Sequence, residues 1–151
     1  MNTLHRLLVA TVLALTALGS TATVAHAHEA VAAGPNKGRL LTVVEPHAEF
    51  LVTADRKVQI TFVGEDGKPV PPGDQVVTVT AGDRSAPTKL TFAKTGDVLL
   101  SDAPLPAGNN FPAVVQFKIT PDAKPVYARF NINLAICGEC KNPEYACTCA
   151  H

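Results

Sequence analysis

The chain has 151 residues, 13 of them lysine or arginine and 13 aspartate or glutamate, so its formal net charge at neutral pH is zero. It contains no tryptophan, two tyrosines and six phenylalanines. Balanced charge without a basic run excludes a nucleic-acid partner, and the scarcity of aromatic rings excludes a stacking platform for sugars or bases.

Residues 1–27 predict a signal peptide. Arg6 supplies a positive start, residues 7–18 are apolar and uncharged, and Ala25 and Ala27 place small residues where a signal peptidase cuts. The apolar run is too short to favour a membrane-spanning helix, so we expect a periplasmic or secreted protein with no stable membrane insertion after signal cleavage. A cut after Ala27 leaves 151 − 27 = 124 residues, enough for one domain, and a cut after Ala25 is the alternative.

Residues 28–38 are expected to form a flexible leader, which begins with a candidate metal ligand. If the cut follows Ala27, His28 becomes the first residue, and its α-amine and imidazole can chelate one Cu(II) ion. If the cut follows Ala25, the α-amine of His26, two backbone amides and the His28 imidazole form a square-planar nitrogen set for Cu(II) or Ni(II). Histidines near a cleavage site can also be incidental, and the sequence leaves both interpretations open.

Residues 39–136 predict an all-β domain. Apolar and polar residues alternate in short runs, which are separated by turn segments such as GEDGKP, AGDRSAP and TGD. The predicted strands are HAEFLVT, KVQITFV, DQVVTVT, TKLTFAK, DVLLS, AVVQFKIT and VYARFNINLAI. Seven or eight strands without a convincing amphipathic helix predict an antiparallel immunoglobulin-like β-sandwich. The stretch APLPAGNNFP also resembles the approach to a late strand in immunoglobulin-like extracytoplasmic domains.

The sequence carries no recognisable catalytic motif. It has no G-x-S-x-G elbow, no glycine-rich phosphate loop and no H-E-x-x-H. Cys149 and His151 are close enough in sequence to suggest a nucleophile and base, but a catalytic thiolate needs a rigid setting that a chain terminus seldom offers. We therefore expect a protein that is not an enzyme.

His47 and Glu49 lie two residues apart on a predicted strand, so their side chains share a face. Because Ala48, Phe50 and Val52 are expected to point inward, this face is predicted to look toward solvent. An imidazole beside a carboxylate can bind a metal ion, with the carboxylate as a co-ligand or as the group that orients the ring. The alternative is an ordinary hydrogen-bonded pair on the surface.

The segment GPNKGRLLTVVEPHAEFLV, residues 34–52, resembles the GPxGGR head of small exported bacterial proteins of unassigned role. It is also distantly similar to the N-terminal segment of periplasmic adaptor subunits from heavy-metal efflux systems. Lys37 replaces the first paired glycine of the pattern, and Asn36 stands where the adaptors often have histidine. The chain lacks the long helical hairpin of an adaptor. The resemblance implies a small domain that works among metal-handling proteins, with a metal-efflux or other envelope protein as its partner.

All four cysteines fall in the predicted tail, residues 137–151, with the spacing C-x2-C-x6-C-x-C-x-H. The spacing is irregular for a zinc ribbon, which pairs two C-x2-C knuckles across a longer loop. Four thiolates this close together can still surround one soft ion such as Cu(I) or Zn(II), and His151 offers a replacement or fifth donor. Asn142 and Pro143 supply a turn that folds the second cysteine pair back on the first.

The export signal raises a competing interpretation, because an even number of cysteines in an oxidising compartment often forms disulfides. A bridge between Cys147 and Cys149 closes a strained ring, so we expect crossed pairing: Cys137 with Cys147 or Cys149, and Cys140 with the other. A redox-active C-G-E-C motif is a third possibility, although such motifs stand at a helix N-terminus and a strand precedes this one.

The sequence thus predicts an exported metal-binding protein that holds or delivers copper, with zinc or nickel as alternatives. The predicted ligands are Cys137, Cys140, Cys147, Cys149 and His151, and a second set comprises His28, His47 and Glu49. The alternative is a non-enzymatic structural or interaction module with a disulfide-stapled tail and no metal.

Overall fold

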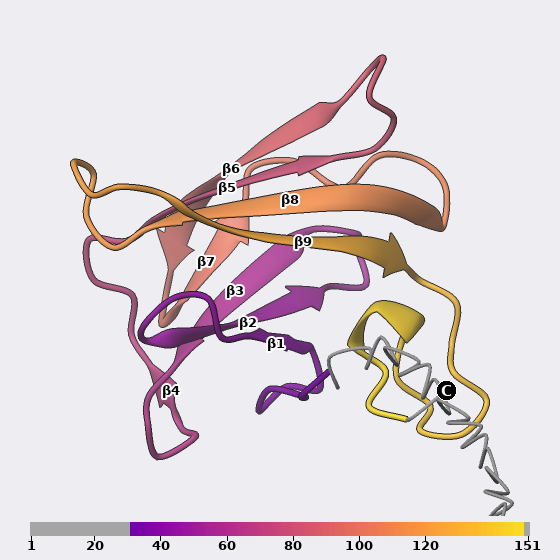
Figure 1. Ribbon diagram of the computed structural model, residues 1–151, viewed down its shortest axis with the longest axis horizontal. Coiled ribbons are helices and arrows are strands. Elements are labelled where there is room, and N and C mark those ends of the chain that lie inside the picture. Colours follow the sequence, from indigo (N-terminus) through magenta and orange to yellow (C-terminus); the bar gives the residue numbers. More distant parts are fainter. Residues whose placement is uncertain (1–30, 150–151) are drawn as a thin grey trace, which may run out of the picture.

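A computed structural model describes residues 31–149. The predicted signal peptide, His28 and His151 therefore lie outside the described residues. The prediction of an all-β domain is confirmed, with one short 3₁₀ helix after the last strand (Figure 1). The strands are β1 (Arg39–Leu41), β2 (His47–Val52), β3 (Val58–Val63), β4 (Pro69–Val70), β5 (Val76–Ala81), β6 (Thr88–Thr95), β7 (Val98–Ser101), β8 (Asn110–Lys118) and β9 (Val126–Asn133), and the helix is η1 (Glu144–Ala146).

Among residues 31–149, eight strands pair antiparallel along one path, β1-β2-β3-β7-β6-β5-β8-β9, and the ninth strand, β4, pairs antiparallel with β3 off this path. Strand β6 changes partner halfway: residues 88–91 pair with β5, and residues 92–95 pair with β7. The strand therefore joins two layers, and the sheet curls so that its two ends approach each other (Figure 1). At this seam the guanidinium of Arg39 in β1 lies 4.7 Å from the ring centre of Phe130 in β9.

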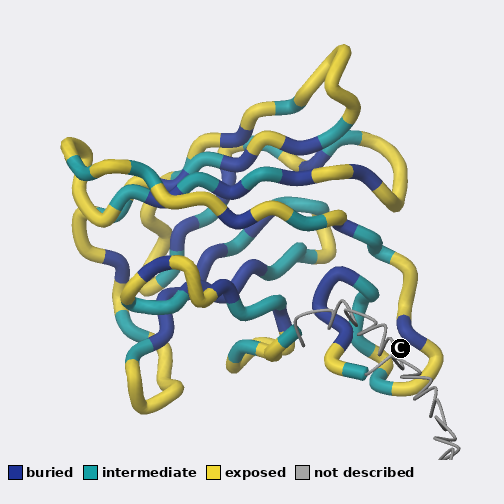
Figure 2. The backbone as a smooth tube through the Cα atoms, viewed as in Figure 1, coloured by how far each residue is buried: buried dark blue, intermediate teal, exposed yellow. Residues whose placement is uncertain are grey.

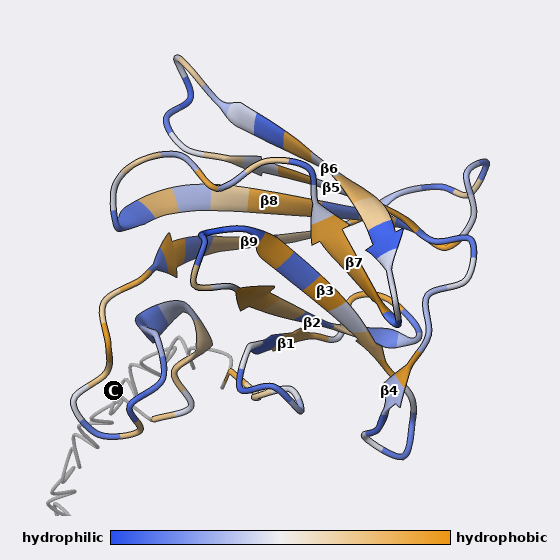
Figure 3. Cartoon of the chain, turned by 180° about the vertical axis from the view of Figure 1, so that it is seen from behind, coloured by the Kyte–Doolittle hydropathy of each residue, from blue (hydrophilic) through white to orange (hydrophobic). Residues whose placement is uncertain are grey.

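The hydrophobic core lies where the two layers face each other (Figure 2). Val58, Ile60 and Phe62 are fully buried as the alternation in β3 predicted, and this alternation is visible along the strand in Figure 3. Phe117 of β8 and Val79 of β5 supply the opposite layer. Between residues 31 and 149, no helix has the length and apolar character needed to cross a membrane.

The prediction that Glu49 faces solvent is wrong, because its side chain is 0% exposed. Residues 34–38 fold over it. The backbone N–H groups of Asn36 and Gly38 each donate to Glu49 Oε1 at 2.8 Å, and the Asn36 side-chain amide donates to Oε2 at 2.7 Å. These three donors compensate the carboxylate for the water it loses. Alternation identified the correct face of β2, but it did not reveal that a second segment covers that face.

The head motif of residues 34–39 is explained by this cap over Glu49. A Cβ at position 34 would lie 2.5 Å from Glu49 Cδ, so only glycine allows the loop to approach this closely. Lys37 has φ 65°, a left-handed conformation that glycine adopts without strain. Position 37 is also the one at which the resembled pattern carries glycine. The conformation of the cap thus accounts for the glycine at position 34 and for the left-handed residue at position 37.

Candidate metal centre

The C-terminal segment, residues 134–149, does not extend away from the domain but folds back on it (Figure 1). The backbone N–H of Glu144, the first residue of η1, donates to the carbonyl of Ala135 at 2.8 Å. Tyr145 in this helix belongs to the hydrophobic core and is 2% exposed. Its hydroxyl oxygen accepts a hydrogen bond of 2.9 Å from the backbone N–H of Val52, and its ring packs edge-on against Phe50. Tyr145 therefore anchors the cysteine-containing loop to the end of β2.

A tight turn at residues 137–142 positions the first two cysteines. The N–H of Cys137 donates to the carbonyl of Asn142 at 2.9 Å, and the N–H of Lys141 donates to the carbonyl of Cys137 at 3.2 Å. Lys141 has φ 61°, which reverses the chain directly after Cys140. The Lys141 ammonium also donates to the carbonyl of Gly138. These contacts bring the sulfurs of Cys137 and Cys140 to one side of the turn, facing the second cysteine pair.

The four cysteine sulfurs converge, with all Sγ atoms within 4.8 Å of one another. The distance from Sγ to Sγ is 3.9 Å between Cys137 and Cys149, and 3.6 Å between Cys140 and Cys147. A disulfide requires about 2.05 Å, so the structure holds these cysteines as thiols. A tetrahedral ion with metal–sulfur bonds of about 2.3 Å separates its ligand sulfurs by about 3.8 Å. The cluster therefore has the dimensions of a tetrathiolate metal site and could bind one metal ion.

Backbone N–H groups and burial set the acidity of the thiols unequally. The N–H of Asn142, with a smaller contribution from Thr148, lowers the pKa of Cys140 below its usual value. At Cys147, the hydrogen bond from the N–H of Cys149 lowers the pKa of the thiol. Burial and the neighbouring thiols of Cys137 and Cys140 outweigh this effect, so the pKa of Cys147 is raised. Burial, followed by the neighbouring thiols, raises the pKa of Cys149. Cys140 is thus the thiol that is most easily ionised of these three, and thiolates are the form that binds metal ions.

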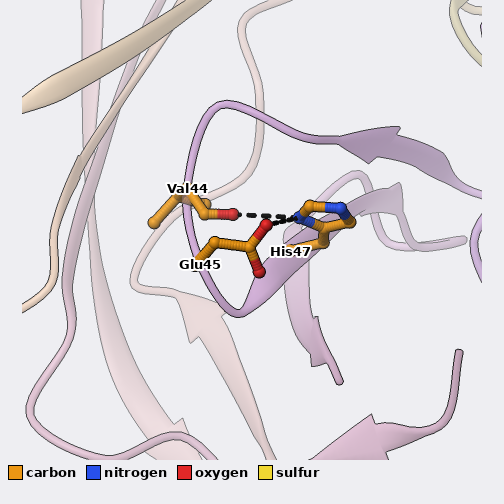
Figure 4. A network of polar contacts seen from close by, with 3 residues as sticks. All are labelled: Val44, Glu45 and His47. Atoms are coloured by element: carbon orange, nitrogen blue, oxygen red, sulfur yellow. Dashed lines mark hydrogen bonds and ion pairs between the residues drawn. The ribbon is translucent and has the colours of Figure 1, made fainter. Parts of the chain in front are cut away.

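The second predicted site does not assemble from the described residues. His47 Nδ1 lies 2.9 Å from Glu45 Oε1 and 3.1 Å from the carbonyl oxygen of Val44 (Figure 4). Both of these contacts are to residues that directly precede β2. Glu49, the expected co-ligand, is enclosed by the cap of residues 34–38. Within residues 31–149, the four cysteines are the only group of three or more Cys, His, Asp or Glu side chains placed to share one ion.

Comparisons with protein families, with curated proteins and with solved structures found no match. The interpretation of the cluster therefore depends on its geometry and chemistry.

Sequence reasoning found the four cysteines but missed the residue that holds them in place. The sequence contained a signal for this role, because Tyr145 is a large aromatic residue in an otherwise polar loop. Burial raises the pKa of its hydroxyl, with the charge of Glu49 adding to the effect, so Tyr145 remains neutral in the core. An aromatic residue inside a cysteine-rich loop is thus a useful indication that the loop packs on a domain.

Proposed function

We propose that the protein binds one soft metal ion through the thiolates of its four cysteines. The observation that carries the proposal is the convergence of four Sγ atoms within 4.8 Å, at spacings of 3.6 and 3.9 Å where one ion would separate them by about 3.8 Å. The anchoring of Tyr145 supports it, because a cluster held against a folded domain is partly organised before the ion arrives.

Zinc is the ion that the arrangement favours. Four thiolates in a compact, roughly tetrahedral set are typical of structural Zn(II) sites, whereas copper sites more often combine fewer thiolates with nitrogen or thioether donors. Copper(I), the ion that we predicted first from the sequence, is also soft and competes for the same sulfurs. Because no histidine among the described residues joins the cluster, the Cu(II) and Ni(II) chelates predicted at His28 form a separate hypothesis.

The proposal is tested by titrating the reduced protein with zinc under an inert atmosphere, in competition with a chromophoric chelator. We expect one zinc ion per chain, with an apparent binding free energy of about 10–16 kcal/mol at neutral pH. Co(II) in place of zinc should give the intense visible bands and sulfur-to-metal charge transfer of a tetrahedral tetrathiolate site. Elemental analysis of the protein as isolated then decides between zinc and copper.

Two variants complete the test. Replacing all four cysteines by serine should abolish zinc binding, and circular dichroism should show that the β domain still folds. His47→Ala removes a histidine that lies outside the cluster and should leave the stoichiometry at one. Equal zinc uptake by the wild type and the four-serine variant, or none by the reduced wild type, contradicts the proposal.

We also propose that this domain works outside the cytoplasm without catalysing a reaction. The signal-like residues 1–27 and the absence of a catalytic motif in the sequence support this assignment. The similarity of residues 34–39 to heads of exported proteins supports a partner among metal-efflux or other envelope proteins. Mass spectrometry of the mature N-terminus is the direct test, because an uncleaved Met1 contradicts export by this signal.

The strand order supports a relation to the immunoglobulin fold. One layer runs β1-β2-β3-β7 and ends on the second half of β6, and its part from β2 to β6 has the neighbour order A-B-E-D of immunoglobulin domains. The other layer runs from the first half of β6 through β5 and β8 to β9, which corresponds to C′-C-F-G. We infer a variant of this sandwich in which β6 serves both layers. A crystal structure with β6 paired to only one layer would contradict the inference.

A further inference from the structure

We propose that thiol oxidation expels the metal ion from the cluster. Oxidation begins at Cys140 and Cys149 and replaces the ion by two disulfides, Cys140–Cys147 and Cys137–Cys149. The proposal rests on the metal-binding function proposed above and adds its regulation. It treats the metal site and the disulfide-stapled tail, which the sequence left as alternatives, as two states of the same four residues.

The first observation is that each accessible sulfur lies beside a buried one. Cys140 and Cys149 are half-buried, whereas Cys137 and Cys147 are 1% and 7% exposed. The half-buried Cys140 lies 3.6 Å from the buried Cys147, and the half-buried Cys149 lies 3.9 Å from the buried Cys137. Thiol–disulfide exchange needs one thiol that an oxidant can reach and a second thiol that resolves the mixed disulfide. Each pair supplies both.

The second observation is that only the burial of the cysteines themselves separates the two kinds of thiol. Each of the four cysteines has an exposed neighbour, such as Gly138 after Cys137 and Thr148 between Cys147 and Cys149. A small disulfide in solvent therefore reaches the half-buried sulfurs of Cys140 and Cys149 more readily than the buried sulfurs of Cys137 and Cys147. Access is one of the factors that set the rate of such exchange.

The reaction balances with a low-molecular-weight disulfide, R–S–S–R, as the oxidant. The Cys140 thiolate attacks one sulfur of the reagent, which forms a mixed disulfide and expels one RS⁻. The Cys147 thiolate then attacks Cys140 Sγ, which forms the protein disulfide and expels the second RS⁻. The same two steps at Cys149 and Cys137 consume a second reagent molecule. In total four thiolates lose four electrons, two reagent molecules yield four RS⁻, and the zinc ion leaves as Zn²⁺ without a change of oxidation state.

Metal and disulfides exclude each other in this site. To reach the bond length of about 2.05 Å, the sulfurs of each pair must approach by roughly 1.5–2 Å from their present spacing. That movement closes the space in which an ion would lie, and a sulfur in a disulfide no longer carries the negative charge that binds the ion. Once Cys140 and Cys147 are joined, only two thiolates remain as ligands.

The experiment treats the zinc-loaded protein with oxidised glutathione and follows zinc release with a chromophoric chelator and thiol loss by titration. We expect one zinc ion per chain to be released as four thiols disappear. Cleavage after Glu139 separates Cys137 from Cys140 for peptide mapping by mass spectrometry. The double variants Cys137→Ser/Cys149→Ser and Cys140→Ser/Cys147→Ser each retain one proposed pair, and each should form an intramolecular disulfide.

A matched pair of variants tests where oxidation begins. Cys140→Ser/Cys149→Ser retains only the buried thiols, and Cys137→Ser/Cys147→Ser retains only the accessible ones. We expect the first to react with oxidised glutathione at least about tenfold more slowly than the second. Equal rates overturn the assigned starting points, and a dominant Cys137–Cys140 or Cys147–Cys149 bridge overturns the pairing.

The outcomes also separate this inference from the function on which it rests. A reduced protein that takes up no zinc contradicts the proposed function itself. A protein that binds zinc and retains it after losing four thiols keeps the proposed function and overturns only the release.

Discussion

Replacing Tyr145 by phenylalanine tests whether the cysteine-containing loop is anchored to the domain. The substitution keeps the buried ring and removes only the hydroxyl that accepts the 2.9 Å hydrogen bond from the N–H of Val52. The contact is part-buried, and a donor left without its partner there costs about 1–3 kcal/mol. A domain of about 120 residues unfolds with an entropy of about 0.25 kcal/mol/K, so each kcal/mol lowers Tm by about 4 °C. We expect Tyr145→Phe to unfold about 4–12 °C below the wild type.

The assay is thermal unfolding of the zinc-free reduced protein, followed by circular dichroism. Tyr127→Phe is the matched control, because Tyr127 is the other tyrosine of the chain and is 41% exposed. The stacking of Arg129 on its ring does not need the hydroxyl, so the control should remain within about 0.5 kcal/mol of the wild type. If Tyr145→Phe unfolds at the wild-type temperature, or if both variants lose equal stability, the anchoring role assigned to Tyr145 is refuted.

Three further predictions follow from the cap and the cluster. Gly34→Ala should destabilise the protein by about 1–3 kcal/mol in urea unfolding, because its Cβ would meet Glu49 Cδ at 2.5 Å, whereas Gly138→Ala, with no atom within 4 Å of its Cβ, should have little effect. Zinc affinity should fall as the pH is lowered from about 8 to about 6. The raised pKa values of Cys147 and Cys149 keep these thiols protonated in the metal-free protein, so the ion must displace their protons. Calorimetry in two buffers measures the number of protons released on zinc binding. A chelator should lower the Tm of the zinc-loaded wild type but leave the four-serine variant unchanged, and an equal shift in both would place the stabilising ion elsewhere.

The sequence allowed the strands to be predicted because their information is local. Alternation in residues 58–63 identified Val58, Ile60 and Phe62 as core residues, and the structure buries all three. The same alternation failed at Glu49, because a period of two shows which side chains share a face but not what lies over that face. The covering loop is 11–13 residues away, and its hydrogen bonds depend on how it folds back.

The cysteine site was predictable in composition but not in geometry. The spacing of Cys137, Cys140, Cys147 and Cys149 brought four thiols within reach of one another, which made both a metal ion and disulfides plausible. What separates the two is the distance between sulfur atoms, and this depends on the turn at Lys141 and on the contact of Tyr145 with a strand 93 residues earlier. Neither the left-handed turn at a lysine nor the distant contact has a local signature in the sequence.

The contact between Tyr145 and Val52 also has a consequence for the order in which the protein acquires its structure. It joins residues that are 93 positions apart, so it closes a loop that contains most of the domain. Contacts of such high sequence separation require a large loop to close, which slows their formation. We therefore expect the four sulfurs to reach the spacing seen in the structure after the two layers have assembled. The rate of metal uptake during refolding should therefore report the last step of folding rather than the first.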